Sequence, residues 1–256
     1  MQRRRHATLF FVKYKIHAFK GVHDSSLGCS DRYFFIGFVT EYKTGVRMTS
    51  FINLPLEMEV LTLLNIKPAV IVTTKGKDGS TNAAPYSWFS IVDYNPPRVL
   101  LSSNMKRDTF RNILETQEFV LNFPGADLLK QIWTTSKHFP YGVNELEKAG
   151  LTWLPSEKVK PPRIKECRVH MECKVIWTKP IGAACVILAE IVSLSIDKEM
   201  SQLGAKDRLI RLNPPLYFSF KQDEKIRKWS FATIGVIHDV EEEDGSVNIK
   251  SEAVGC

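Results

Sequence analysis

The amino-acid sequence predicts a mainly β fold, a barrel of short strands with a few short helices. Three observations point to it. Apolar segments rich in β-branched residues recur from Ala69 to Phe220. Turn signals separate them, above all Asp78-Gly79 and Asn95-Pro96-Pro97. Helical periodicity is confined to two short stretches. With 256 residues, 44% of them hydrophobic, the chain can bury a sizeable core.

The first expected element is a short helix over residues 57–66, which ends before Lys67-Pro68. Strands are then expected over residues 69–74, 82–92, 98–103, 118–123, 168–178, 184–196 and 216–220. A second helix begins at Asp108 or Thr109, because either residue suits the N-cap position. Residues 124–162 are expected to be rich in loops, and a turn is expected over residues 179–182.

Charge separates the first 47 residues from the rest of the chain. Residues 1–47 hold nine lysines and arginines against three acids, and the other residues hold 26 against 25. The excess of basic residues therefore belongs to a leader, and the body of the protein has no charge pattern that predicts a nucleic-acid partner. The expected organisation is a basic leader (1–47), a barrel domain (48–235) and a polar, disordered tail (236–256) that contains Glu241-Glu242-Glu243-Asp244.

The leader does not read as an export signal. Its apolar run from Ala7 to Val12 is too short for a secretory peptide, and three acids argue against the alternative of a mitochondrial presequence. Met48 precedes the first patterned segment, so we hypothesise that translation begins there; peptides from residues 1–47 found by mass spectrometry would exclude this. The longest apolar stretch, Ile181 to Val192, is shorter than the ~20 residues that span a bilayer. A soluble, cytoplasmic protein without a membrane partner is expected.

Several kinds of site are not predicted. No Cys-x-x-Cys or His-x-x-x-His occurs, which argues against a disulfide framework or a metal site. Cys167, Cys173 and Cys185 are expected to be buried, inert thiols. The signatures of the dinucleotide fold, the P-loop and the nucleophile-elbow hydrolases are absent, and no catalytic triad can be assigned.

The positive signal for a ligand is the segment from Ser102 to Thr109. A strand that ends in hydroxyls, followed by Lys106 and by Thr109 at a helix start, would place a positive charge and free N–H groups around one anion. The segment therefore predicts a phosphate-bearing ligand. From these residues alone, an alternative stays open in which Asp108 or Thr109 only caps the helix while Lys106 and Arg107 face solvent.

Together with this segment, several others resemble the flavin reductase-like, FMN-binding split-barrel family, which includes the flavoredoxins. The matching segments are 68–74, Asp78-Gly79, Asn82-Ala83-Ala84-Pro85-Tyr86-Ser87, Asn95-Pro96-Pro97, 106–113, 118–122, 144–151 and 188–192. The resemblance runs from Pro68 to about Lys198 and leaves the leader and the tail uncovered. It implies a six-stranded Greek-key barrel that forms a homodimer, with FMN in a groove at the dimer interface.

The resemblance also implies which residues contact the flavin. Asn82, Ala84, Pro85 and Ser87 match the segment that lines the flavin, and Ser102, Ser103, Lys106 and Thr109 match the phosphate-binding segment. Asp108 and Asn112 are expected to hold the phosphate loop. Tyr86, Trp88 and Phe89 either stack on the flavin or nicotinamide ring or belong to the core. His138 either lines the outer mouth of the site or is an ordinary surface residue.

The implied function is that of an FMN-dependent oxidoreductase, with FAD as the alternative cofactor and an NAD(P)H-dependent flavin reductase as the main expectation. One difference from the family pattern favours functions other than NADH-dependent reduction. Reductases of the family that use NADH commonly carry Gly-Asp-His before the last barrel strand, where this chain has Gly182-Ala183-Ala184. The alternatives are a flavoredoxin-like carrier that receives electrons from a partner protein and a non-catalytic flavin-binding module. A partner monooxygenase that receives reduced flavin is a further expectation.

Overall fold

The computed structural model describes residues 66–222, 227–243 and 246–254. Contacts between Cα atoms divide the chain into Met1–Asn53 and Leu54–Cys256, and all the described residues belong to the second unit. The basic leader, the start at Met48 and all but the last residue of the helix expected over 57–66 lie outside the described residues. The boundaries predicted at 47/48 and 235/236 stay predictions.

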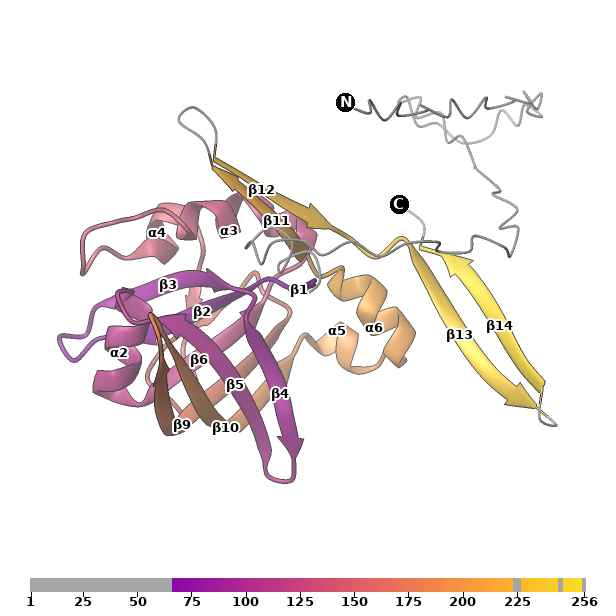
Figure 1. Ribbon diagram of the computed structural model, residues 1–256, viewed down its shortest axis with the longest axis horizontal. Helices are drawn as coiled ribbons and strands as arrows, with labels where there is room; N and C mark the ends of the chain where they lie inside the picture. Colours follow the sequence, from indigo (N-terminus) through magenta and orange to yellow (C-terminus); the bar gives the residue numbers. More distant parts are fainter. Residues whose placement is uncertain (1–65, 223–226, 244–245, 255–256) are drawn as a thin grey trace, which may run out of the picture. The chain divides into compact units, whose positions relative to one another are not determined.

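The barrel is built from one seven-stranded sheet in which all neighbouring strands are antiparallel (Figure 1). The order of its strands is β3-β2-β6-β9-β10-β5-β4. Their bounds are β2 Val70–Lys75, β3 Thr81–Tyr86, β4 Phe89–Tyr94, β5 Pro97–Asn104, β6 Glu118–Phe123, β9 Val169–Ile181 and β10 Ala184–Ile196. The predicted mainly β split barrel with a few short helices is confirmed.

The strand expected over residues 82–92 is two strands, β3 and β4, which form the two opposite edges of the sheet. Strands β3 and β4 are one extended segment that bends at Ser87-Trp88. If this segment is counted once, the seven strands of the sheet come from six segments of the chain. After the bend the chain pairs with β5, and Ser102 N–H donates to the Trp88 carbonyl at 2.9 Å. A single serine is a weak turn signal, and the bend follows from pairing with β5, so the sequence did not predict it.

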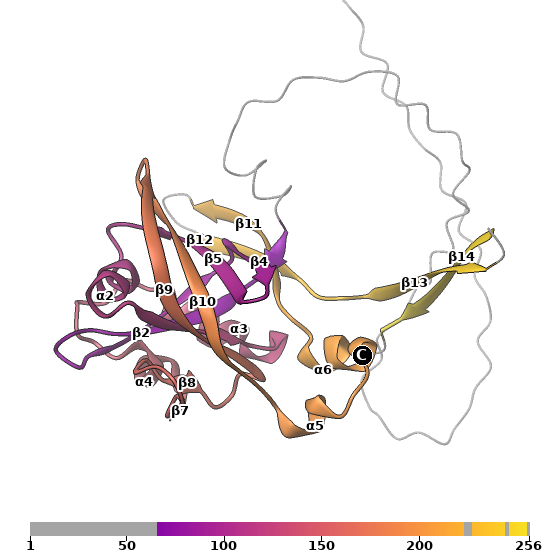
Figure 2. The ribbon, with the colours of Figure 1, turned by 90° about the horizontal axis from the view of Figure 1, so that it is seen from below.

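Glycines at the turns shape two hairpins of the sheet. In the β2–β3 hairpin Gly79 has φ +85° and Ser80 N–H donates to Asp78 Oδ1 at 3.0 Å, as the Asp-Gly pair predicted. Strands β9 and β10 form a long hairpin that projects beyond the other strands (Figure 2). Its turn lies at Gly182-Ala183, with φ +58° at the glycine, and not over the expected residues 179–182, because 179–181 continue β9.

The core has two parts, one on each side of β2. Inside the barrel, alternate residues of β2, β5, β6 and β10 pack with Phe110 and Ile113 of the helix α2, Asp108–Thr116. Outside the barrel, Ile71 and Ala83 pack against the helices α3, Leu129–Thr135, and α4, Glu145–Ala149 (Figure 1). Both faces of β2 are therefore covered, which accounts for its uninterrupted β-branched run.

The stretch 124–162 is rich in loops, as expected, but it also contains short helices. They are the 3₁₀ helix η1, Ala126–Leu128, with α3 and α4. Helix α4 has five residues, so it shows no periodicity; it is held by its cap Asn144, whose Oδ1 accepts from Leu146 N–H at 3.1 Å, and ends at Gly150, φ +67°. Two further short helices follow the barrel, α5 Lys198–Ser201 and α6 Ala205–Leu212.

Smaller sheets complete the described residues. One joins β1 Lys67–Pro68, β11 Leu216–Gln222 and β12 Arg227–Ala232; another joins β7 Trp153–Leu154 and β8 Arg163–Ile164. Where the sequence predicted a disordered tail, β13 Val236–Glu243 and β14 Ser246–Ala253 form an antiparallel hairpin. Over the described part of the chain, no helix is both long and apolar enough to cross a membrane.

The three cysteines predicted to be buried are buried and free: Cys167, Cys173 and Cys185. Burial raises the pKa of the Cys167 and Cys173 thiols. Both thiols are therefore protonated at neutral pH; their burial is confirmed, and their inertness stays a prediction.

Candidate functional site

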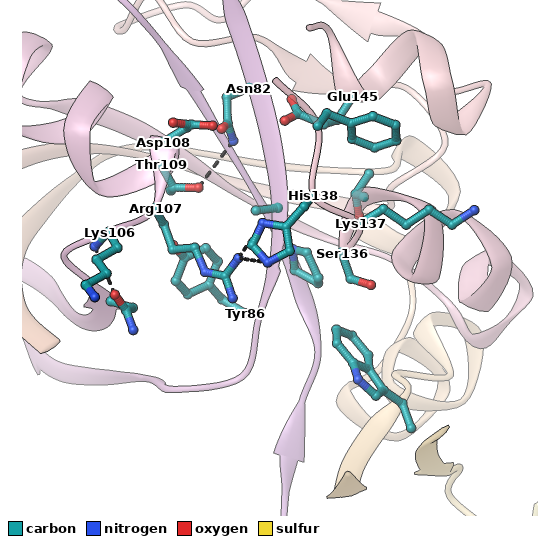
Figure 3. A pocket seen from close by; sticks show the side chains of 16 residues that line it. Asn82, Tyr86, Lys106, Arg107, Asp108, Thr109, Ser136, Lys137, His138 and Glu145 are labelled. Atoms are coloured by element: carbon teal, nitrogen blue, oxygen red, sulfur yellow. Dashed lines mark hydrogen bonds between the residues drawn. The ribbon is translucent and has the colours of Figure 1, made fainter. Parts of the chain in front are cut away.

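A pocket of about 270 Å³ opens where several distant parts of the chain meet. Its wall is formed by β3, by the turn from β5 into α2, by the loop after α3 with the start of α4, and by Trp229 of β12. Figure 3 shows the side chains of these segments converging on the pocket. The Trp229 ring contacts the Trp133 ring of α3 at 5.6 Å between centroids, which ties β12 to this wall.

Most of the residues expected to contact a flavin lie at this pocket, and they are Asn82, Ala84, Pro85, Lys106 and Thr109. Ser87, Ser102 and Ser103 do not line it. Ser103 is buried and contacts two residues that line the pocket: its Oγ lies 2.7 Å from the Tyr86 hydroxyl and donates to the Asn104 carbonyl at 3.5 Å. Ser102 alternates with the buried Leu101 and Ser103 and so lies on the outer face of β5.

Helix α2 begins at the pocket without a side-chain cap. The expectation that Asp108 or Thr109 caps this helix is wrong, because Arg107 holds the N-cap position and makes no capping hydrogen bond. Asp108 and Thr109 are the first two helical residues. The N–H groups of this first turn and the helix dipole therefore favour an anion in the pocket, beside Lys106 and Arg107.

Buried hydrogen bonds fix this end of the helix. Asn82 Nδ2 donates to Thr109 Oγ1 at 3.2 Å, and Asn112 Nδ2 donates to Thr74 Oγ1 at 3.1 Å. Tyr141 donates to Asn112 Oδ1 at 3.3 Å. Asn112 therefore anchors the helix to β2, and Asp108 lines the pocket; that these two residues hold a phosphate loop stays a prediction. Thr109 is held in place by Asn82, so its position does not depend on a ligand.

The aromatic residues of the β3–β4 segment have different surroundings. Tyr86 lines the pocket and also packs against the barrel core. Burial raises the pKa of Tyr86, and hydrogen bonds with the Ser103 and Thr109 hydroxyls partly offset this. Phe89 packs edge-on against Phe123 at 5.8 Å between ring centroids, in the core. Trp88 is 45% exposed and does not line the pocket.

Arginine and histidine meet across the pocket. Arg107 Nη1 lies 3.3 Å from Nδ1 and 3.0 Å from Nε2 of His138, and Figure 3 shows the two side chains reaching toward each other from opposite walls. His138 is an exposed residue of a surface loop, and it also lines the pocket. Local sequence could not predict this contact, because its two residues lie 31 positions apart.

Glu145 lines the same pocket and was missed as a site residue, because its segment carried only a family match. It is 7% exposed, and its Oε2 accepts from Ala83 N–H at 3.1 Å. Burial raises the pKa of Glu145, with a smaller contribution from the nearby charge of Asp108. The pocket therefore contains a buried carboxyl group in addition to its basic side chains.

Gly182-Ala183-Ala184, which stand where NADH-dependent reductases commonly have Gly-Asp-His, lie next to the pocket. Ala184 pairs with Asn104, which lines the pocket, and Met105 N–H donates to the Ala183 carbonyl at 3.2 Å. A histidine at position 184 would thus stand beside Asn104. In this chain the imidazole at the pocket comes instead from His138, on the loop after α3.

Comparison with known proteins places these features in a family. An uncharacterized protein of Aquifex aeolicus (strain VF5) is 39% identical over 143 residues, which are 54% of this chain and 73% of that protein. Nitrilotriacetate monooxygenase component B from Bacillus cereus is 26% identical, with a TM-score of 0.64, over 73% of this chain and 96% of that chain. Flavoredoxin of Desulfovibrio vulgaris (Miyazaki F) shares the fold at 20% identity and a TM-score of 0.58, over 71% of this chain and 93% of that chain.

The model of one family matches most of the described barrel. It spans residues 65–227, which include β1 to β11, the start of β12 and, apart from Trp229, every residue that lines the pocket. By this match the chain belongs to the family described as the flavin reductase like domain.

Proposed function

We propose that the pocket binds FMN, with the phosphate at the start of α2. The observation that carries this proposal is the uncapped N-terminus of a nine-residue helix, placed beside Lys106 and Arg107 in a pocket. These are the donors that a phosphate dianion requires. Thr109 adds a hydroxyl, and Asn82, Ala84 and Pro85 of β3 would lie along the rest of the cofactor. FAD is the alternative ligand.

The activity that fits best is that of an oxidoreductase, in its main form an NAD(P)H-dependent flavin reductase. Bound flavin supplies the two-electron redox chemistry, and the chain's own residues bind and orient it. Family membership and the neighbouring solved structures support an oxidoreductase. His138 and Arg107, at the pocket and partly open to solvent, are available to contact a second, anionic substrate.

A second candidate is a flavoredoxin-like carrier that receives electrons from a partner protein. The observation that favours it is Ala184, which stands beside the pocket where NADH-dependent relatives commonly have a histidine. A non-catalytic flavin-binding module is the third reading. The Bacillus cereus protein is named as component B of a nitrilotriacetate monooxygenase, and a monooxygenase that receives reduced flavin is a further proposal for this chain.

A homodimer is part of the proposal, and an apolar outer surface supports it. Exposed large side chains occur at the bend before β4 and on β9: Trp88 is 45% exposed, Trp177 43% and Ile181 58%. Ser102 lies on the same outer face, so a second subunit there would bring this serine close to a bound flavin. Light scattering after size-exclusion chromatography tests it; a monomer at micromolar concentration would refute the dimer.

The visible absorption spectrum tests the function directly. The purified, desalted chain is mixed without oxygen, first with NADH and then with NADPH. A flavin band that bleaches with either nucleotide establishes a reductase, whereas a band that persists until a reduced carrier protein is added establishes the carrier. A band that neither donor bleaches favours the non-catalytic module. No flavin band after incubation with FMN would refute the proposed function.

A further inference from the structure

Glu145 is a buried acid on the pocket wall for which phosphate binding gives no reason. It is 7% exposed, and none of the ion pairs formed within the described parts of the chain includes it. Its hydrogen bond from Ala83 N–H needs only an acceptor oxygen and no charge. Because an unpaired buried carboxylate is costly, a glutamine would fill the same place at lower cost.

The charge of the pocket is uneven. Figure 3 shows Lys106 and Glu145 on opposite sides, with Arg107 and His138 between them. If the phosphate lies at the start of α2, beside Lys106, the rest of the cofactor extends away from that end. On that placement Glu145 would border the part of the flavin that accepts electrons, and its charge would act on the ring across the pocket.

We propose that the Glu145 carboxylate lowers the reduction potential of the bound flavin. The inference rests on the proposed function. Two electrons and one proton from solvent, with the proton forming the N5–H bond, turn the neutral oxidised isoalloxazine into a ring with one negative charge. A carboxylate nearby disfavours that charge and leaves the oxidised ring unaffected, so the reduced cofactor becomes a stronger electron donor.

The size of the effect follows from Coulomb's law. At an effective dielectric constant of about 20, a unit charge as far as about 12 Å from the ring still changes the ratio of the affinities for oxidised and reduced flavin roughly tenfold, so a carboxylate that borders the ring changes this ratio at least that much. For a two-electron couple this is a shift of ~30 mV. The other ionisable groups that face Glu145 across the pocket are Tyr86, Lys106, Arg107, Asp108, Lys137 and His138. They are the same in all the variants compared below, so the difference isolates Glu145.

The test is a spectroelectrochemical titration of the FMN-loaded full chain, with dithionite as the chemical reductant. Glu145→Gln keeps an acceptor for Ala83 N–H and removes the charge. The matched control is Glu147→Gln on the same helix, where the exposed side chain accepts from Asn144 Nδ2 at 3.0 Å and does not line the pocket. We expect the midpoint potential to rise by at least ~30 mV in Glu145→Gln at alkaline pH and to stay unchanged in Glu147→Gln.

The possible results separate this inference from the proposed function. An unchanged potential in Glu145→Gln that still binds FMN overturns the inference alone, because a purely structural role predicts that result. No FMN binding by the unaltered chain overturns both. If Glu145→Gln does not fold, the pH dependence of the potential of the unaltered chain tests the inference instead. As pH falls and Glu145 is protonated, the potential of bound FMN must rise relative to that of free FMN, and a constant difference would refute the inference.

Discussion

Replacing Lys106 with alanine tests where the phosphate binds. Lys106 lines the pocket beside the uncapped start of α2, so its ammonium group is placed for a charge-assisted hydrogen bond to a phosphate. Such a bond contributes about 1.5–3 kcal/mol, and because Lys106 is exposed, the lower value applies. We therefore expect the Kd for FMN to increase by about tenfold in Lys106→Ala.

The assay is quenching of flavin fluorescence on titration with protein, for FMN and for riboflavin, which lacks the phosphate. Riboflavin should bind Lys106→Ala and the unaltered chain equally well. Lys148→Ala is the control, because it removes the same charge from the last turn of α4, away from the pocket. The difference for FMN should shrink at about 1 M salt, where charges on the surface are screened. Equal losses for FMN and riboflavin, or none for FMN, would refute the phosphate site.

Three further changes probe the structure around the pocket and the barrel. Thr109→Val removes the acceptor of the buried Asn82 Nδ2, and the free energy of unfolding in urea should fall by about 1–2 kcal/mol; no change would mean that this amide finds another partner. Asn122 is fully buried, donates to the Ile71 carbonyl at 2.9 Å and accepts from Ile164 N–H at 2.9 Å, so Asn122→Ala should lower the same free energy by about 3 kcal/mol, and a loss below about 1 kcal/mol would contradict this reasoning. Burial lowers the pKa of His170 below its ordinary value of 6.5, so stability is fully present above pH 6.5 and decreases as pH falls through the native pKa, because the unfolded chain takes up a proton that the native one resists. Urea unfolding on both sides of that pH should show the decrease, and His170→Asn should show less of it.

Local signals were sufficient for most of the barrel. The Asp78-Gly79 turn and the β-branched run of β2 each depend on neighbouring residues, and the predicted strands match β5, β6 and β10 closely. The bend at Ser87-Trp88 was missed because it follows from pairing with β5, which local sequence does not encode. Helix α4 was missed because five residues are too few for a period, and its stability comes from Asn144 and from the packing of Leu146 against Ile71.

The site was predictable where it lies in one segment. Lys106 and Thr109 stand together in the chain, and the helix that follows places both at the pocket. Glu145 and the contact between Arg107 and His138 were not predictable, because they come together only through the packing of α3 and α4 against β3. The cytoplasmic location expected from the sequence stays a prediction.

The order of the strands in the sheet has a consequence for how the protein matures. Strand β2 pairs with β6, and β6 pairs with β9, so the sheet closes only when segments about 50 residues apart have met. Closing such long loops is slow, and the pocket, with walls from Asn82 to Trp229, does not exist until it is done. A flavin that binds in this pocket would therefore load onto a chain that has already folded. Abundant flavin would hold the folded form by mass action, by about 2.7 kcal/mol at a hundred times its Kd, without shortening the time that folding takes.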